Sequence, residues 1–132
     1  MSGLGALLTV GAEELFRQVN PKFVNGDQLS GQVFEAMKKD QGLLSVNRSS
    51  KMAAKAAFER FLASGFQSVG VVAVTVAECG QVGLKAHEDP LTEDPSHAVI
   101  DYNGRTDGEA RRARKQLALM AQTRGWSHRP VV

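Results

Sequence analysis

Arg17 is the first residue whose type and setting could support chemistry. In "LFRQV" it shares a face with Leu15 and Val19 if the segment alternates as a strand does. A guanidinium on an apolar face needs an acidic partner or a ligand anion, because an unpaired buried charge is costly. On an edge strand Arg17 would instead reach water, and both interpretations stay open.

Two more polar residues lie beside apolar segments. Ser45, in "LLSVNR", can hydrogen-bond to the backbone and have no other role. Glu78 follows a run of valine, alanine and threonine, where alternation places it on the face of Val72 and Val74. It could end a strand in water, pair with Arg17 across the sheet, or be a catalytic carboxylate with a raised pKa.

His97 begins the segment "HAVIDY" and shares a strand face with Val99 and Asp101. A nearby aspartate can fix the tautomer of a histidine and raise its basicity. The alternative is a structural histidine that ties the preceding acidic loop to the sheet. We expect its ring to be at least partly buried and hydrogen-bonded, either to Asp101 or to the loop carboxylates Asp89 and Asp94.

The single cysteine, Cys79, has no second cysteine with which to form an internal disulfide. Glu78 beside it opposes the lowered pKa that a nucleophilic thiol needs. His87 and His128 lie in a predicted loop and tail, without the spacing of metal ligands. We therefore expect no metal and no cofactor, and a reducing cytoplasm is the simple interpretation.

Charge is distributed unevenly along a chain with a formal net charge of only +2. Acidic residues dominate 78–101, whereas basic residues dominate from 105 onward. Four basic residues cluster near the start of a predicted helix, where the helix dipole disfavours cations: Arg111, Arg112, Arg114 and Lys115. Besides a solvated helix face, this cluster indicates contact with an acidic protein surface. No aromatic residues alternate with it, so nucleic acid is not the expected partner.

Seven segments have the pattern of regular structure. The predicted strands cover 13–24 (broken at Asn20-Pro21), 32–37, 43–48, 68–78 and 97–102, and the predicted helices cover 49–65 and 108–125. Ser49 or Ser50 is expected to cap the first helix and Asp107 the second. Residues 84–96 are expected to form a loop, and Val74 to be fully buried in a central strand.

This order predicts an α+β fold over residues 1–132, as a single domain. We expect a mixed or mostly antiparallel sheet of about five strands with two main helices packed on it. Residues 1–12 are expected to be loose, and 126–132 to form a tail. The first residues lack the basic region of a signal peptide, and no apolar run approaches the roughly eighteen residues of a membrane span, so no membrane association is expected.

Four spaced segments carry a family resemblance: "LFRQVNP", "GQVFEAMKKDQGLLSV", "VGVVAVTVAECGQVGL" and "DPSHAVIDY". Over about residues 14–125 the chain resembles a family of small bacterial proteins usually described as hypothetical. The resemblance implies a bacterial, cytoplasmic, single-domain protein, and it brings no established activity with it.

A second likeness is to ADP-ribosyltransferase-type domains, which use an arginine, a serine and a glutamate on successive strands. Arg17, Ser45 and Glu78 occur in that order. The likeness implies NAD as a substrate, with the arginine holding its phosphates and the glutamate polarising its ribose. The second serine usual in that pattern is absent, since Val46 follows Ser45, and the chain is short for that fold.

We therefore expect a non-enzymatic module that binds or regulates an acidic protein, in a toxin, immunity or defence context. The alternative is a small ADP-ribosyltransferase-like enzyme that uses Arg17, Ser45, Glu78 and His97. Convergence of these side chains in a concave site would favour the enzyme, and separate positions would favour the binding module.

Overall fold

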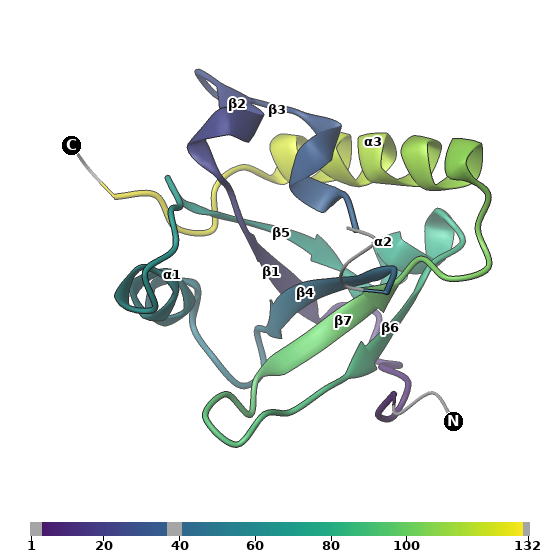
Figure 1. The fold of residues 1–132 in the computed structure, drawn as a ribbon, viewed down its shortest axis with the longest axis horizontal. Coiled ribbons are helices and arrows are strands. Elements are labelled where there is room, and N and C mark those ends of the chain that lie inside the picture. The colour runs from purple at the N-terminus through teal and green to yellow at the C-terminus, as the bar shows by residue number, and fades with distance from the viewer. Residues whose placement is uncertain (1–3, 37–40, 131–132) are drawn as a thin grey trace.

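The computed structural model describes residues 4–36 and 41–130, which form an α+β fold around a five-stranded antiparallel sheet (Figure 1). The strand order is β5-β1-β4-β7-β6. These strands are β1 (Glu14–Gln18), β4 (Leu43–Arg48), β5 (Val71–Thr75), β6 (Lys85–Glu88) and β7 (His97–Asp101). The helices are α1 (Ala54–Ala63), α2 (Val76–Gln81) and α3 (Asp107–Arg124), with two 3-10 helices, η1 (Pro21–Phe23) and η2 (Gly31–Phe34), and a hairpin of β2 (Val24–Asn25) and β3 (Gln28–Leu29). The predicted fold class is confirmed.

Alternation along the strands divides the apolar core between the two faces of the sheet. The larger part lies between the sheet and α3, where Leu15, Val74 and Leu117 are fully buried. The smaller part lies on the opposite face, where Phe16 packs with Phe58 of α1. The two main helices therefore cover opposite faces (Figure 1). Val74 is buried as expected, but β5 is an edge strand rather than a central one.

The N-terminal segment covers the outer edge of β6. Leu8 N donates to Ala86 O at 2.9 Å, and Glu88 N donates to Ala6 O at 2.9 Å. Gly5 lies so close to this strand that a Cβ on it would be 2.1 Å from Glu88 O. The expectation of a loose segment over residues 1–12 is therefore wrong for residues 6–8, which pair with β6. The free backbone N–H and C=O groups at the edge of β6 hold this segment in place, and the segment's own sequence does not reveal them.

The outer edge of β5 is covered by the other end of the chain. Val71 N donates to His128 O at 2.7 Å, and Ser127 N donates to Val71 O at 2.8 Å. Both edges of the sheet thus carry a short paired segment, which leaves fewer free backbone groups for another strand to join.

The valine-rich segment ends as a strand at Thr75, before Glu78. Thr75 Oγ1 accepts from Glu78 N at 3.1 Å, and Glu78 Oε1 accepts from Thr75 N at 2.8 Å. This reciprocal capping box starts α2. Glu78 consequently lies on a helix and not on the strand face where alternation had placed it.

Two other element predictions are wrong. The predicted strand over 32–37 is replaced, in its described residues, by η2, which buries the neighbouring side chains of Val33 and Phe34. A strand would send neighbours to opposite faces, so the helical turn is what allows both to reach one core. The predicted loop over 84–96 contains β6, whose four residues form a strand by pairing with β7.

The two main helices begin differently from the prediction. Thr106, not Asp107, is the N-cap of α3, and it forms a capping box with Glu109. Helix α1 begins after Ala53 and has no side-chain cap. The predicted caps Ser49 and Ser50 precede the helix, and their hydroxyls bond to the segment around β1 instead.

Candidate functional site

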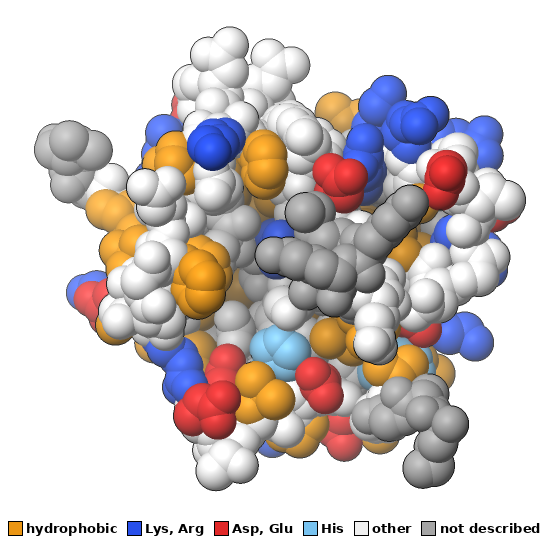
Figure 2. Space-filling model, viewed as in Figure 1, with side chains coloured by type: hydrophobic (Ala, Val, Ile, Leu, Met, Phe, Trp, Pro, Cys, Tyr) orange, Lys and Arg blue, Asp and Glu red, His pale blue; other side chains and the backbone are white. Residues whose placement is uncertain are grey.

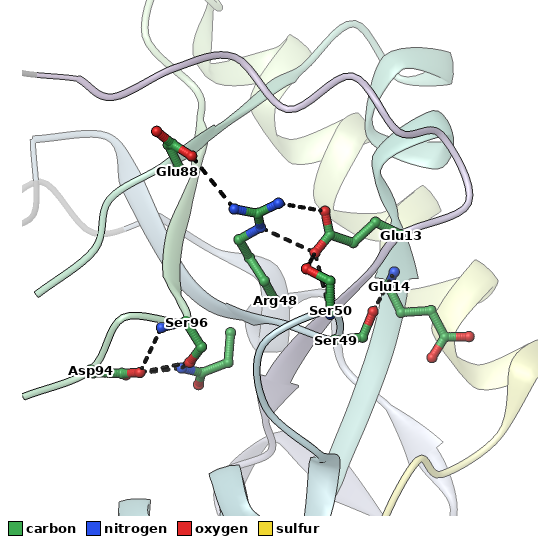
Figure 3. Close-up of polar contacts among 9 residues, drawn as sticks. Glu13, Glu14, Arg48, Ser49, Ser50, Glu88, Asp94 and Ser96 are labelled. Carbon is green, nitrogen blue, oxygen red and sulfur yellow. Dashed lines mark hydrogen bonds and ion pairs between the residues drawn. The ribbon is translucent and has the colours of Figure 1, made fainter.

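A buried ion pair lies where β4 ends (Figure 3). Arg48 Nε donates to Glu13 Oε2 and Arg48 Nη2 to Glu13 Oε1, each at 3.1 Å. The Ser50 hydroxyl donates to Glu13 Oε2 at 2.5 Å. Arg48 Nη1 also lies 3.5 Å from Glu88 Oε2 on β6. The Glu13 side chain is 5% exposed, so this carboxylate depends on protein donors in place of water.

A second buried carboxylate, Asp94, is held by the residue before Arg48. Asn47 Nδ2 donates to Asp94 Oδ2 and to Ser96 Oγ, both at 2.9 Å. The Ser96 hydroxyl donates to Asp94 Oδ1 at 2.6 Å, and Arg48 N donates to Ser96 O at 2.9 Å. Asn47 and Arg48 are neighbours on β4, so the two clusters are connected there. Together they hold Glu13 before β1, Glu88 at the end of β6 and the loop before β7 against the end of β4.

The network positions segments rather than presenting a reactive group. Burial alone would raise the pKa of Glu13, but hydrogen bonds from Arg48 and Ser50 and the charge of Arg48 hold that pKa below its ordinary value. The carboxylate is ionised at neutral pH, and both of its oxygens are occupied by protein donors. Arg48 was not among the residues predicted from the sequence to be functional. Arg48 shares a strand face with the apolar residues Leu44 and Val46. The same kind of position, an arginine on an apolar face, is why Arg17 was predicted to need a partner.

Acid should destabilise the protein partly through Glu13. A carboxyl whose pKa is lowered by folding contributes stability above its unfolded pKa, and this contribution is lost as the pH falls through the folded pKa. We expect the urea concentration at the unfolding midpoint of the wild type to decrease as the pH is lowered below about 4.5. In Glu13→Gln, which has no carboxylate to protonate at this position, the midpoint should decrease less steeply with pH. Parallel midpoint curves for the two proteins would contradict this assignment. Glu78, whose pKa is also lowered, remains as a source of acid sensitivity in both.

Arg17 holds η2 against the sheet. It lies on β1, an inner strand, where Nε donates to Val33 O at 2.8 Å and Nη1 donates to Ser45 O at 3.0 Å. Tyr102 Oη supports the same turn by donating to Phe34 O at 2.6 Å. The Ser45 side chain is exposed on the opposite face of the sheet, so Arg17 meets the carbonyl of Ser45 and not its hydroxyl.

Glu78 pairs with Arg124 of α3 rather than with Arg17. Arg124 Nη2 lies 2.8 Å from Glu78 Oε2, and Nη1 lies 2.9 Å from Oε1. Partial burial would raise the pKa of Glu78, but the hydrogen bonds from Arg124 and from the Thr75 amide hold it below its ordinary value. The raised pKa considered for a catalytic carboxylate is therefore not present.

His97 is mostly buried and joins the acidic loop to β7. Its Nδ1 lies 3.0 Å from Asp89 Oδ2 and 3.1 Å from Asp89 O. The side chain is 17% exposed. The expected burial and hydrogen bonding are confirmed, and the partner is Asp89 of the loop. Asp101 instead accepts from Asn103 N.

The four candidate catalytic residues do not converge. Arg17 serves η2, Glu78 joins α2 to α3, His97 meets Asp89, and the Ser45 side chain is exposed. Cys79 is not a substitute nucleophile, because burial, with a smaller contribution from the charge of Glu78, raises the pKa of its thiol to about 12. The concave site that the enzyme hypothesis requires of these four side chains is therefore not formed by them.

The basic cluster divides between one anchored and three exposed side chains. Arg114 Nη1 lies 2.9 Å from Glu35 Oε2, which fixes it toward η2. Arg111, Arg112 and Lys115 are exposed, and none of them forms a salt bridge with a residue that the structure describes. Basic side chains gather over this end of α3 at the upper right of Figure 2.

Further along the same helix one large apolar side chain is exposed. Leu119 is 64% exposed. Beside it a pocket of about 390 Å³ lies between α2 and α3, and it is lined by Glu78, Leu119, Met120, Thr123 and Arg124. One helix therefore presents basic side chains and an exposed leucine to solvent.

Comparison with known proteins identifies no relative: no protein-family model, no curated protein and no solved structure matches this chain. Among residues 4–36 and 41–130, no group of three or more His, Cys, Asp or Glu side chains is arranged to hold a metal ion. None of the helices described is both long enough and apolar enough to span a bilayer.

Proposed function

We propose that this protein is a binding module for another protein, and that the outward face of α3 is its contact surface. The observation that supports this most is the spacing of exposed residues on that helix. Arg111, Lys115 and Leu119 follow one another at i, i+4 spacing and so lie on one stripe, with Arg112 beside it. Basic and apolar contacts are thus available side by side to a single partner.

The basic side chains are poorly explained by the stability of α3 alone. They lie beyond the first turn of α3, where the helix dipole has little effect, and none of them forms a salt bridge with a described carboxylate. The helix is instead stabilised by its capping box at Thr106 and by burial of Leu117. Arg111, Arg112 and Lys115 therefore fit a role in recognition better than a role in folding.

The partner that complements this surface carries carboxylates and one apolar anchor. The carboxylates would face the basic side chains of α3, which steers association and makes it sensitive to salt. The anchor would enter the pocket beside Leu119. A role in a toxin, immunity or defence system stays a prediction. In such a system the partner protein would carry these carboxylates and this apolar anchor.

Selection from a random peptide library on the immobilised protein tests the proposal. We expect the selected peptides to combine Asp or Glu with a large apolar residue, and to bind more weakly as salt is raised. The triple variant Arg111→Ala, Arg112→Ala, Lys115→Ala should lose at least about tenfold in affinity, which corresponds to about 1.4 kcal/mol.

A control triple variant removes the same charge elsewhere: Lys22→Ala, Lys51→Ala and Lys55→Ala, all exposed. It should bind as the wild type does. Selected peptides without acidic residues, or equal binding by the α3 triple variant, would contradict the proposal. Tighter binding of duplex DNA than of any acidic peptide would replace the protein partner by nucleic acid.

A further inference from the structure

A second pocket, away from the outward face of α3, has a different chemistry. Its volume is about 400 Å³, and it lies where the β2–β3 hairpin meets the C-terminal end of α3. Val72 and Ala121 contribute buried apolar atoms, and Leu29 is half-buried. Asp27 contributes a carboxylate and Trp126 an indole ring. This volume is in the range of pockets that hold small molecules.

The indole of Trp126 is held in a fixed place. One side of it presses on Gly70, where an added Cβ would lie 2.8 Å from the ring atom Cε3. The two residues that follow it, Ser127 and His128, are paired with Val71 of β5. Both the ring and its backbone are therefore anchored to the sheet.

The chain itself places a cation in this site. The guanidinium of Arg129 lies over the Trp126 ring, 4.4 Å from its centroid, and forms an ion pair with Asp27. Asp27 is carried by the β2–β3 hairpin, which is fixed to α3 because Leu29 N donates to Gln122 Oε1 at 2.8 Å. An aromatic face and a carboxylate together are the groups that recognise a planar guanidinium.

Arg129 holds this position weakly. Asp27 is 81% exposed and Arg129 39% exposed, and exposed ion pairs contribute little to stability. Arg129 is not among the residues that line the pocket, so its side chain does not fill the space beside the indole. A guanidinium arriving from outside could form the same rim contacts and, in addition, fill the pocket with its hydrocarbon chain.

We propose that this pocket binds a small molecule with a guanidinium group on a hydrocarbon chain, and that Arg129 occupies the guanidinium position when no ligand is bound. The ligand's guanidinium replaces that of Arg129 between Trp126 and Asp27. Its hydrocarbon chain packs on Leu29 and Val72. The site is independent of the α3 surface proposed for the protein partner.

Titration with butylguanidinium tests this directly, because Trp126 is the only tryptophan of the chain and its fluorescence reports the site. We expect a saturable change in the wild type and tighter binding by Arg129→Ala. If Arg129 fills the site in about nine molecules of ten, its removal tightens the apparent affinity about tenfold. Arg105→Ala, which removes an exposed arginine outside both proposed sites, should leave the affinity at the wild-type value.

Asp27→Asn in the Arg129→Ala background should weaken binding several-fold, and butylammonium should bind at least several-fold more weakly than butylguanidinium. Absence of a saturable change in Arg129→Ala, equal binding of butylammonium, or full binding by Asp27→Asn would each overturn the proposal. A Gly-Arg-Gly peptide distinguishes the source of the group. Weaker binding than butylguanidinium supports a small molecule, and tighter binding supports an arginine borne by a protein.

Discussion

Arg48→Ala is expected to destabilise the fold by about 3–5 kcal/mol, because it leaves the Glu13 carboxylate buried without its charged partner. The substitution removes two donors to Glu13 and the contact with Glu88. The hydroxyl and amide of Ser50 both meet Oε2 and cannot replace a guanidinium that meets both carboxylate oxygens. Urea unfolding measures the loss, as a lower midpoint at unchanged slope.

Two controls separate the buried charge from general damage. Lys55→Ala, on the exposed face of α1, should stay within about 0.5 kcal/mol of the wild type. The double variant Arg48→Met, Glu13→Gln removes both charges and should recover part of the loss, since the penalty comes from the unpaired charge. A single Arg48→Ala variant as stable as Lys55→Ala would show that the Glu13–Arg48 pair does not support the fold.

The parts of the fold that sequence patterns predicted are those in which local preference and burial agree. β5 is rich in valine, and β-branched side chains suit a buried strand. α3 repeats apolar residues at helical spacing, and Ala113, Leu117 and Ala121 are buried on that stripe. Both elements were predicted, and with them the α+β class.

Other elements form because of residues far away along the chain. β6 has no strand-forming composition, and it is a strand because β7 on one side and residues 6–8 on the other offer backbone partners. In the same way, the apolar composition of β5 predicted a central strand. β5 is an edge strand of the sheet, and its outer edge is covered by Ser127 and His128 instead of by another strand of the sheet. Composition indicates burial, and strand order depends on pairings that the sequence does not display.

The candidate site residues lie apart for a related reason. Glu78 was placed by strand alternation, and the capping box at Thr75 changed the periodicity of the chain before it reached Glu78. Arg17 was correctly indicated as needing partners, and among the described residues these partners include the carbonyls of Val33 and Ser45. Alternation can mark a polar side chain on an apolar face, but it does not identify what that side chain meets.

Gly5→Ala is expected to detach the N-terminal segment from β6, because the new Cβ would lie 2.1 Å from the backbone oxygen of Glu88. Two backbone hydrogen bonds and the burial of Leu8 depend on that pairing. Their loss should cost about 2–4 kcal/mol. The amides of Leu8 and Glu88 should exchange hydrogen faster, while Ile100 on β7 keeps its protection.

Detachment also has a consequence for association, because it frees the outer edge of β6 for another chain. Sedimentation at increasing concentration should show self-association in Gly5→Ala. Gly80→Ala is the matched control, since a Cβ at Gly80 meets nothing within 4 Å and alanine suits the interior of α2. It should remain as monodisperse as the wild type and be at least as stable. If Gly5→Ala matched Gly80→Ala in both exchange and sedimentation, the N-terminal segment would not be what protects this edge of the sheet.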